Sequence, residues 1–302
     1  MSVTIDRVYL TEAEWKARAE QHMDRASDWT RPYRDRRARG TMHPVHDFLF
    51  IYYRFAPALL EQWHPGIDLH LETGDSGNAW SPKFYTQVNG CTFLEPAKID
   101  SKIHKRLNWS LSIIKAALNR APQFGCFGLH EWAMVYRGGP EGRLRHEGTL
   151  PLRLTQQETD QVVESQPICC SHFDAFRFFT ESAQPLNLRQ PTQAGRLENE
   201  QAGCLHTNMD LYKWTAKSMP WLSSDLLWET FLYAGSCREI DMRASPYDCR
   251  QLGYEPIRVE TAEGRVEYED AQRKLAEQAR PIRLKLITEL ERILKAAPKI
   301  NL

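Results

Sequence analysis

Four short segments of the chain place a histidine beside a carboxylate or within one helical turn of it. The four groups are His43, His46 and Asp47; His130 and Glu131; His172 and Asp174; and His206 and Asp210. Each segment continues into aromatic residues, which would form a dry cavity where charges interact strongly. Imidazole changes its charge near neutral pH, and an adjacent carboxylate fixes its tautomer and raises its basicity. The pattern predicts one active site assembled from several elements.

The spacing within the pairs predicts how they point. His206 and Asp210 are four residues apart and would share one face of a helix. His172 and Asp174 are two residues apart, which suits a strand, where such residues point to the same side. Cys169 and Cys170 are the cysteines nearest to this chemistry, directly before the His172 segment.

Glu131 is the preferred catalytic acid or base. It follows Gly125 and Gly128 within an apolar run from residue 124 to residue 135. A carboxylate buried there is costly without a partner or a chemical role. Its pKa should rise unless His130 or another cation compensates, and a raised pKa suits proton transfer near neutral pH.

Several blocks of the sequence resemble those of a bacterial family of chains of similar length. They are His-Pro-Val-His-Asp-Phe-Leu-Phe-Ile-Tyr-Tyr (43–53), Trp-His-Pro-Gly (63–66), Cys-Phe-Gly-Leu-His-Glu-Trp (126–132), Asp-Met-Arg-Ala-Ser-Pro-Tyr-Asp (241–248) and Val-Glu-Thr-Ala-Glu-Gly-Arg-Val-Glu-Tyr (259–268). Members of that family commonly carry the label 3-methyladenine DNA glycosylase. The resemblance covers most of the chain and implies an activity on modified nucleobases.

The first functional hypothesis is therefore a hydrolase that cleaves the N-glycosidic bond of an alkylated nucleobase and needs no cofactor. Aromatic faces would bind the cationic base, and Asp47, Glu131 or Asp174 would orient water. Its partner would be DNA or a small molecule that contains a nucleobase, with phosphates held by the arginines between Arg31 and Arg39. The predicted substrate-binding residues are Tyr52, Tyr53, Trp132, Phe176, Trp214, Arg34 and Arg37.

The second hypothesis is a non-haem iron or manganese enzyme that acts on a small molecule. Histidines and carboxylates from several helices are the ligands that such an ion requires in a helical fold. The candidate ligands are His46, His130, His172, His206, Asp47, Glu131, Asp174 and Asp210. A third, non-catalytic interpretation is that the pairs are buried hydrogen-bonded groups that fix the packing of helices.

The composition narrows the classes of protein. The formal net charge of the 302 residues is zero, so no global attraction to nucleic acid or anionic lipid is expected. Seven cysteines without regular spacing favour a reducing cytoplasm over a disulfide framework. No secretory signal and no membrane span is expected.

The elements that must position these residues are mostly helices. We expect one mainly α domain, residues 1–302, with a small β-hairpin around Asn89-Gly90. The capping boxes Thr11-x-x-Glu14 and Thr155-x-x-Glu158 each predict a helix start, and Asp100 predicts a third. The expected helices are one from Thr11 to about Met23, a buried one over 44–61 that is bent or stopped near Pro57, one from Asp100 ending before Pro122, two separated by Pro220 within 198–245, and a charged one over 267–297 divided at Pro281. Loops are expected at 138–150 and 183–197, and a short strand and turn over 259–266.

Overall fold

The computed structural model describes residues 8–74, 80–138 and 150–299. The chain is mainly helical with a small four-stranded sheet, which confirms the predicted fold class. It divides into two compact units that are each discontinuous in sequence. Unit 1 comprises Met1–Ser112, Tyr212–Leu232 and Leu284–Leu302, and unit 2 comprises Ile113–Leu211 and Tyr233–Arg283. The predicted loop at 138–150 lies almost entirely outside the described residues.

Unit 1 begins with strand β1 (Val8–Leu10) and helix α1 (Glu12–Ala38). The predicted capping box at Thr11 and Glu14 is present. The predicted end of this helix near Met23 is wrong, because α1 continues through Pro32. Ala26, Thr30 and Tyr33 are buried at helical spacing, so packing of one face extends the helix beyond what its polar sequence suggests.

The predicted helix over 44–61 is two short helices, and the predicted break near Pro57 is confirmed. Helix α2 (Phe48–Tyr53) ends at Arg54, which adopts the left-handed conformation with φ 56°. Helix α3 (Pro57–Glu61) then begins with Pro57, which suits a first helical position. The predicted burial on all sides is wrong, since Ile51 is 45% exposed.

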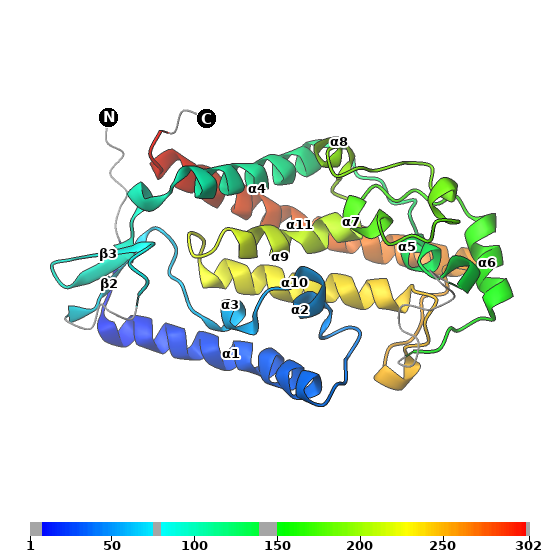
Figure 1. Cartoon of the computed structure of the whole chain (residues 1–302), viewed down its shortest axis with the longest axis horizontal. Coiled ribbons are helices and arrows are strands. Elements are labelled where there is room, and N and C mark those ends of the chain that lie inside the picture. The colour runs from blue at the N-terminus through cyan, green and yellow to red at the C-terminus, as the bar shows by residue number, and fades with distance from the viewer. Residues whose placement is uncertain (1–7, 75–79, 139–149, 300–302) are drawn as a thin grey trace. The chain divides into compact units, whose positions relative to one another are not determined.

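The sheet of unit 1 has the strand order β1-β2-β4-β3, with β2 (Leu69–Glu72) parallel to β1. Strands β3 (Tyr85–Val88) and β4 (Cys91–Leu94) form the predicted hairpin. Asn89 and Gly90 have φ values of 51° and 73°, as a tight two-residue turn requires. The first turns of α1 lie beside β1 and β2 (Figure 1).

Four long helices contribute residues to both units. They are α4 (Ser101–Asn119), α9 (Leu205–Lys217), α10 (Ser224–Arg243) and α11 (Ala262–Ala296). The side chain of Asp100 accepts from the Ile103 amide at 2.7 Å, so the predicted cap of α4 is confirmed. The predicted pair of helices on either side of Pro220 is confirmed as α9 and α10.

Two predictions near α11 are wrong. No strand forms over 259–266, because the Thr261 hydroxyl accepts from the Gly264 amide and α11 starts at once. A β-carbon on Gly264 would lie 1.9 Å from the Arg258 carbonyl oxygen, so only glycine fits this turn. Pro281 does not divide the helix, and the buried Ala279 and Ile282 anchor it on the two sides of that position.

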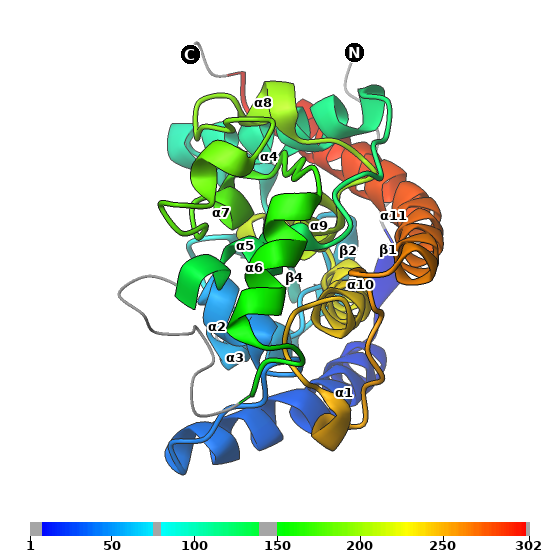
Figure 2. The same ribbon diagram turned by 90° about the vertical axis from the view of Figure 1, so that its right-hand side faces the viewer.

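Unit 2 also holds four shorter helices: α5 (Leu129–Ala133), α6 (Gln156–Ser165), α7 (Phe173–Phe176) and α8 (Arg196–Asn199). Helix α6 starts at the predicted capping box of Thr155 and Glu158. It packs against α5 and the 3-10 turn η3 (Tyr136–Gly138), as Figure 2 shows for α5. The segment 183–197 is largely irregular, with the 3-10 turn η5 (Gln184–Leu186), and further 3-10 turns are η2 (Pro96–Lys98) and η6 (Arg250–Leu252).

Candidate functional site

Three of the four predicted histidine–carboxylate pairs gather within unit 2. His130 on α5, His206 on α9 and Asp241 on α10 form a first group, in which one ligand atom from each residue lies within 4.8 Å of the others. His130 Nε2 is 2.8 Å from Asp241 Oδ1, and the rings of His130 and His206 meet edge to face at 4.4 Å. All three side chains are buried. This arrangement can hold a metal ion.

A second group comprises His172, Asp174 and Asp210, with ligand atoms again within 4.8 Å of one another. His172 Nε2 is 3.3 Å from Asp210 Oδ2. His172 is fully buried, and its Nδ1 atom has no hydrogen-bond partner among the described residues. The predicted strand is wrong here, because His172 precedes α7 and Asp174 lies within that helix.

Helix α9 contributes to both groups. His206 and Asp210 share one face of it, as their spacing predicts. The His206 ring also stacks on the His172 ring, with centroids 5.4 Å apart. The two candidate metal groups are therefore adjacent, with His206 between the other two histidines.

Arg238 on α10 links the first group to Glu131. Its Nη1 atom donates to Glu131 Oε1 at 2.8 Å and to Asp241 Oδ2 at 2.5 Å. Arg238 and Asp241 are each 1% exposed, and Glu131 is 3% exposed. Arg238 is thus the compensating cation that a buried Glu131 requires. It also orients Asp241 toward His130, as groups behind a metal ligand commonly do.

Sequence reasoning missed Asp241 and Arg238. Their i, i+3 spacing on α10 is the signal that was available, because it puts both charges on one face of a helix that is otherwise rich in apolar residues. Without the fold, such a pair is also typical of a solvated surface.

Burial and neighbouring charge act in opposite directions on the first group. Burial would lower the pKa of His130, but Asp241 and its hydrogen bond raise it overall. Burial would raise the pKa of Asp241, but His130, His206 and Arg238 hold it well below its usual range. Burial together with His130 lowers the pKa of His206 to about 3, so this imidazole is neutral at physiological pH. A neutral imidazole is the form that binds a metal ion.

Two further charged residues surround the second group. Arg196 forms an ion pair with Asp174, and its Nη1 atom lies 3.8 Å from Glu200 Oε1. Glu200 is buried, and its Oε1 atom lies 4.0 Å from His172 Nε2. Neither residue was predicted, because both lie at the end of a polar segment that reads as a surface loop.

A cavity of about 180 Å³ adjoins the first group and reaches His130 and His206. Four cysteines line it, namely Cys126, Cys169, Cys170 and Cys204. Burial raises the pKa of Cys204 to about 12 and also raises the pKa of Cys126 and of Cys170, so these three thiols are neutral. The sequence position of Cys169 and Cys170 near His172 was the available signal for this wall.

A strained turn positions α5. Phe127 and Gly128 both have positive φ values, 44° and 70°, directly before the helix that carries His130 and Glu131. A β-carbon on Gly128 would lie 3.3 Å from both Ala244 Cβ and Tyr268 Cε2. The indole nitrogen of Trp132, which lies in α5 itself, donates to the Ala244 carbonyl at 2.9 Å. The end of α10 and the start of α11 therefore hold α5 in place.

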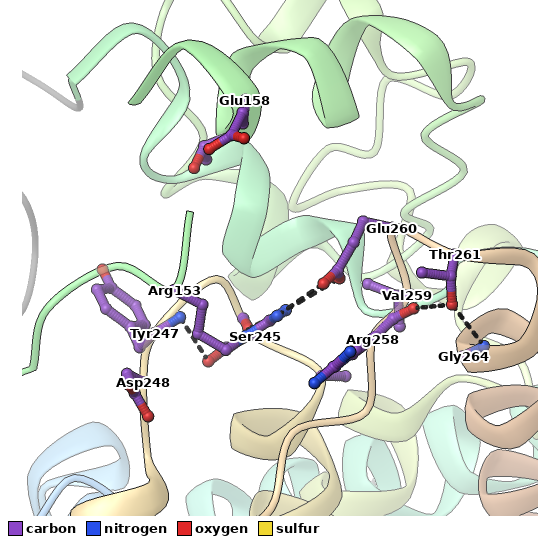
Figure 3. A network of polar contacts seen from close by, with 12 residues as sticks. Arg153, Glu158, Ser245, Tyr247, Asp248, Arg258, Val259, Glu260, Thr261 and Gly264 are labelled. Carbon is purple, nitrogen blue, oxygen red and sulfur yellow. Dashed lines mark hydrogen bonds and ion pairs between the residues drawn. The ribbon is translucent and has the colours of Figure 1, made fainter. Parts of the chain in front are cut away.

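A polar network fastens the segment after α10, which follows Asp241 by a few residues (Figure 3). Arg153 donates to Glu260 at 2.7 Å and 3.0 Å and to the Ser245 carbonyl at 3.3 Å. Its guanidinium also lies over the Trp132 ring. Leu152 and Tyr247 form an antiparallel bridge alongside. These contacts stabilise the end of α10 without taking part in the candidate metal groups.

The fourth predicted pair belongs to unit 1. His43 and His46 stack with ring centroids 4.1 Å apart. Asp47 is buried and accepts from Arg36 Nε at 2.9 Å and from the His43 amide at 2.8 Å. Burial and His46 lower the pKa of His43 to about 4. Asp47 thus has a structural role in joining α1 to the segment before α2.

The predicted aromatic residues lie elsewhere than in the lining of the 180 Å³ cavity. Tyr52 and Tyr53 pack against each other in unit 1, and Tyr53 also contacts Tyr212. Trp132 and Phe176 are part of the apolar core of unit 2. Trp214 belongs to unit 1 and lies beneath the Lys213 and Lys217 ammonium groups.

The two predicted phosphate-binding arginines differ in their surroundings. Arg34 forms an ion pair with Glu61, which occupies its guanidinium. Arg37 is exposed and lines a cavity of about 650 Å³ beside α2.

The comparisons with known proteins found no match to any family model, curated protein or solved structure. Within the described residues, no helix combines the length and apolar character that crossing a membrane would demand.

Proposed function

We propose that this chain is a metal-dependent enzyme that holds iron or manganese in unit 2 and acts on a small molecule. One observation carries the proposal. Two sets of three imidazole and carboxylate side chains, all buried except the half-buried Asp174, each bring their ligand atoms within 4.8 Å of one another. Buried carboxylates are costly unless a cation compensates them, and imidazole and carboxylate are the ligands that iron and manganese take in proteins.

The first group has the ligand types of a facial triad, with two histidines and one carboxylate: His130, His206 and Asp241. Such a set leaves coordination positions open and is typical of non-haem iron. Because the 180 Å³ cavity reaches His130 and His206, a substrate could approach from that side. His130, His206 and Asp241 would hold the ion, which would supply Lewis-acid chemistry to a ligand in the cavity.

The cavity also limits the size of the substrate. Its volume of about 180 Å³ is below the roughly 300–1,000 Å³ of pockets that hold drug-sized ligands. The thiols of Cys126, Cys170 and Cys204 in its wall are neutral, so the proposed substrate is a small, largely uncharged molecule. The role of Arg238 is to hold Asp241 and Glu131 and thereby keep the first group in place.

The nucleobase-releasing activity implied by the sequence resemblance stays a prediction. Its three candidate bases, Glu131, Asp47 and Asp174, are each held by an arginine. The metal-dependent proposal is preferred because it accounts for the convergence of the buried histidines with these carboxylates.

The test is metal analysis of protein that was purified without a metal-affinity tag and then reconstituted anaerobically with ferrous iron or manganese. The wild type should retain bound metal after gel filtration, and His206→Ala, which loses a ligand of the first group only, should retain about one ion per chain fewer. His64→Ala is the matched control, because His64 is also buried but hydrogen-bonds to Tyr85 in unit 1. A wild type that emerges metal-free after both reconstitutions would contradict the proposal.

A further inference from the structure

A second cavity in unit 2, of about 330 Å³, is unusually rich in arginine. Arg120, Arg273, Arg280 and Arg283 line it together with the carboxylate of Glu277. Leu118, Pro122 and Phe124 supply apolar wall. None of these residues belongs to the candidate metal groups or to the lining of the 180 Å³ cavity. The cavity is therefore a separate feature of the unit.

Arg283 is the residue that points to a ligand. It is 1% exposed, and its Nη2 atom donates to Asn208 Oδ1 at 2.5 Å. Its Nε and Nη1 atoms are buried and have no hydrogen-bond partner among the described residues. Guanidinium presents five N–H donors in a rigid fork that matches a carboxylate or phosphate. Burying a guanidinium whose N–H donors lack acceptors costs free energy of folding, unless a bound anion accepts hydrogen bonds from them.

From this geometry we propose that the 330 Å³ cavity binds a small organic anion, with its acidic group on Arg283 and its apolar body against Phe124 and Leu118. The inference is independent of the metal-dependent function. Burial lowers the pKa of Arg283, which fits a cation in need of a counter-charge.

The other arginines define how the anion is held. Arg120 is fixed as part of the wall, since it donates to the carbonyl oxygens of Glu200 at 2.5 Å and Leu197 at 2.8 Å. Arg273 lies over the Phe124 ring and pairs with Glu269 at 2.6 Å. Arg280 is exposed on α11 and lies at the cavity rim, where it adds positive charge. Glu277 opposes a highly charged ligand, so a monoanion fits best.

The experiment is isothermal titration of the full chain with hexanoate and, separately, with inorganic phosphate. Hexanamide, which has the same body without the charge, serves as the ligand control. We expect saturable binding of hexanoate, no binding of hexanamide, and a melting temperature that rises with hexanoate concentration. Binding of phosphate as well would show that the acidic group alone is sufficient for recognition.

Arg283→Gln should weaken hexanoate binding by at least about tenfold, because it removes a charge-assisted contact. Arg280→Ala should weaken it by a smaller but measurable factor, because it removes positive charge at the cavity rim. Arg280 is exposed, so its variant remains informative if Arg283→Gln fails to fold. Lys274→Ala, an exposed cation on α11 that does not line the cavity, is the charge-matched control and should bind as the wild type does.

The metal-site variant His206→Ala separates this site from a bound ion that simply captures carboxylates. Retained binding of hexanoate by that variant supports the arginine cavity, and loss of binding assigns the effect to the metal groups. No saturable binding of either anion, or unchanged affinity in both arginine variants, would overturn the proposal.

Discussion

His206 and Asp210 lie one turn apart on α9, and each faces a different buried histidine. The His206 ring meets the His130 ring at 4.4 Å, and Asp210 Oδ2 lies 3.3 Å from His172 Nε2. The register of a single helix therefore sets the spacing between the two candidate metal groups. A local shift of α9 would change both groups together.

We expect the two groups to lose metal separately. Asp241→Asn should remove about one ion per chain from the first group, and Asp210→Asn about one ion from the second, because each removes a charged ligand. The double variant should then be free of metal. The measurement is elemental analysis of each variant after the same reconstitution. If Asp210→Asn keeps the full content, the second group is a structural ion-pair network.

Glu131→Gln tests whether Glu131 acts in catalysis or in packing. The change removes the negative charge that Arg238 contacts at 2.8 Å in a buried setting. Breaking a buried ion pair costs about 3–5 kcal/mol, and the remaining contact of Arg238 with Asp241 should keep the loss near the lower value. Urea unfolding measures it, with the exposed Glu277→Gln as control. Unchanged stability together with abolished turnover would make Glu131 the catalytic base.

Gly128→Ala should destabilise the fold by about 1–2 kcal/mol, since alanine at a φ of 70° is strained and its β-carbon would crowd Ala244 and Tyr268. Gly125→Ala is the matched control, because a β-carbon there meets no atom within 4 Å. Thermal unfolding of the two variants side by side gives the difference. Equal melting temperatures would show that the turn before α5 relaxes freely.

Stability should fall as the pH drops below neutral, and His64 should account for part of the fall. Burial lowers the pKa of His64 to about 4, so the folded state prefers the neutral ring. Its contribution is present above the unfolded pKa of about 6.5 and is lost as the pH falls toward 4, to a total of roughly 3 kcal/mol. Unfolding free energies of wild type and His64→Gln from pH 7 to pH 4 check this. His104→Gln, on α4, is the control for replacing a histidine by glutamine. If the unfolding free energies of wild type and His64→Gln fall in parallel with pH, His64 does not contribute to the pH dependence.

Local signals in the sequence predicted the helix starts and the hairpin. The capping boxes at Thr11 and Thr155, the cap at Asp100 and the Asn89-Gly90 turn depend only on neighbouring residues, and all are present. Helix continuity could not be predicted in the same way. Pro32 and Pro281 lie inside helices because tertiary packing on both sides outweighs the lost hydrogen bond.

Only part of the candidate site could be predicted from the sequence, namely the histidines, because a histidine beside a carboxylate in an apolar segment is uncommon. Buried histidines beside carboxylates mark His130, His172 and His206, and the structure brings these three together. Asp241, Arg238 and Glu200 were missed, because charged residues on helices and loops are ordinarily solvated and their burial depends on the fold. The aromatic lining was predicted because the aromatic residues are close to the histidines in sequence. In the structure, Trp132 and Phe176 instead belong to the apolar core of unit 2.

The close approach of Gly128, Ala244 and Tyr268 joins three sequence blocks that are far apart along the chain. A larger side chain at position 128 has room only if the side chains at positions 244 and 268 give way. In related chains position 128 should therefore be enlarged only together with a change at 244 or 268. A change at any one of them alone would shift α5 and, with it, the imidazole of His130.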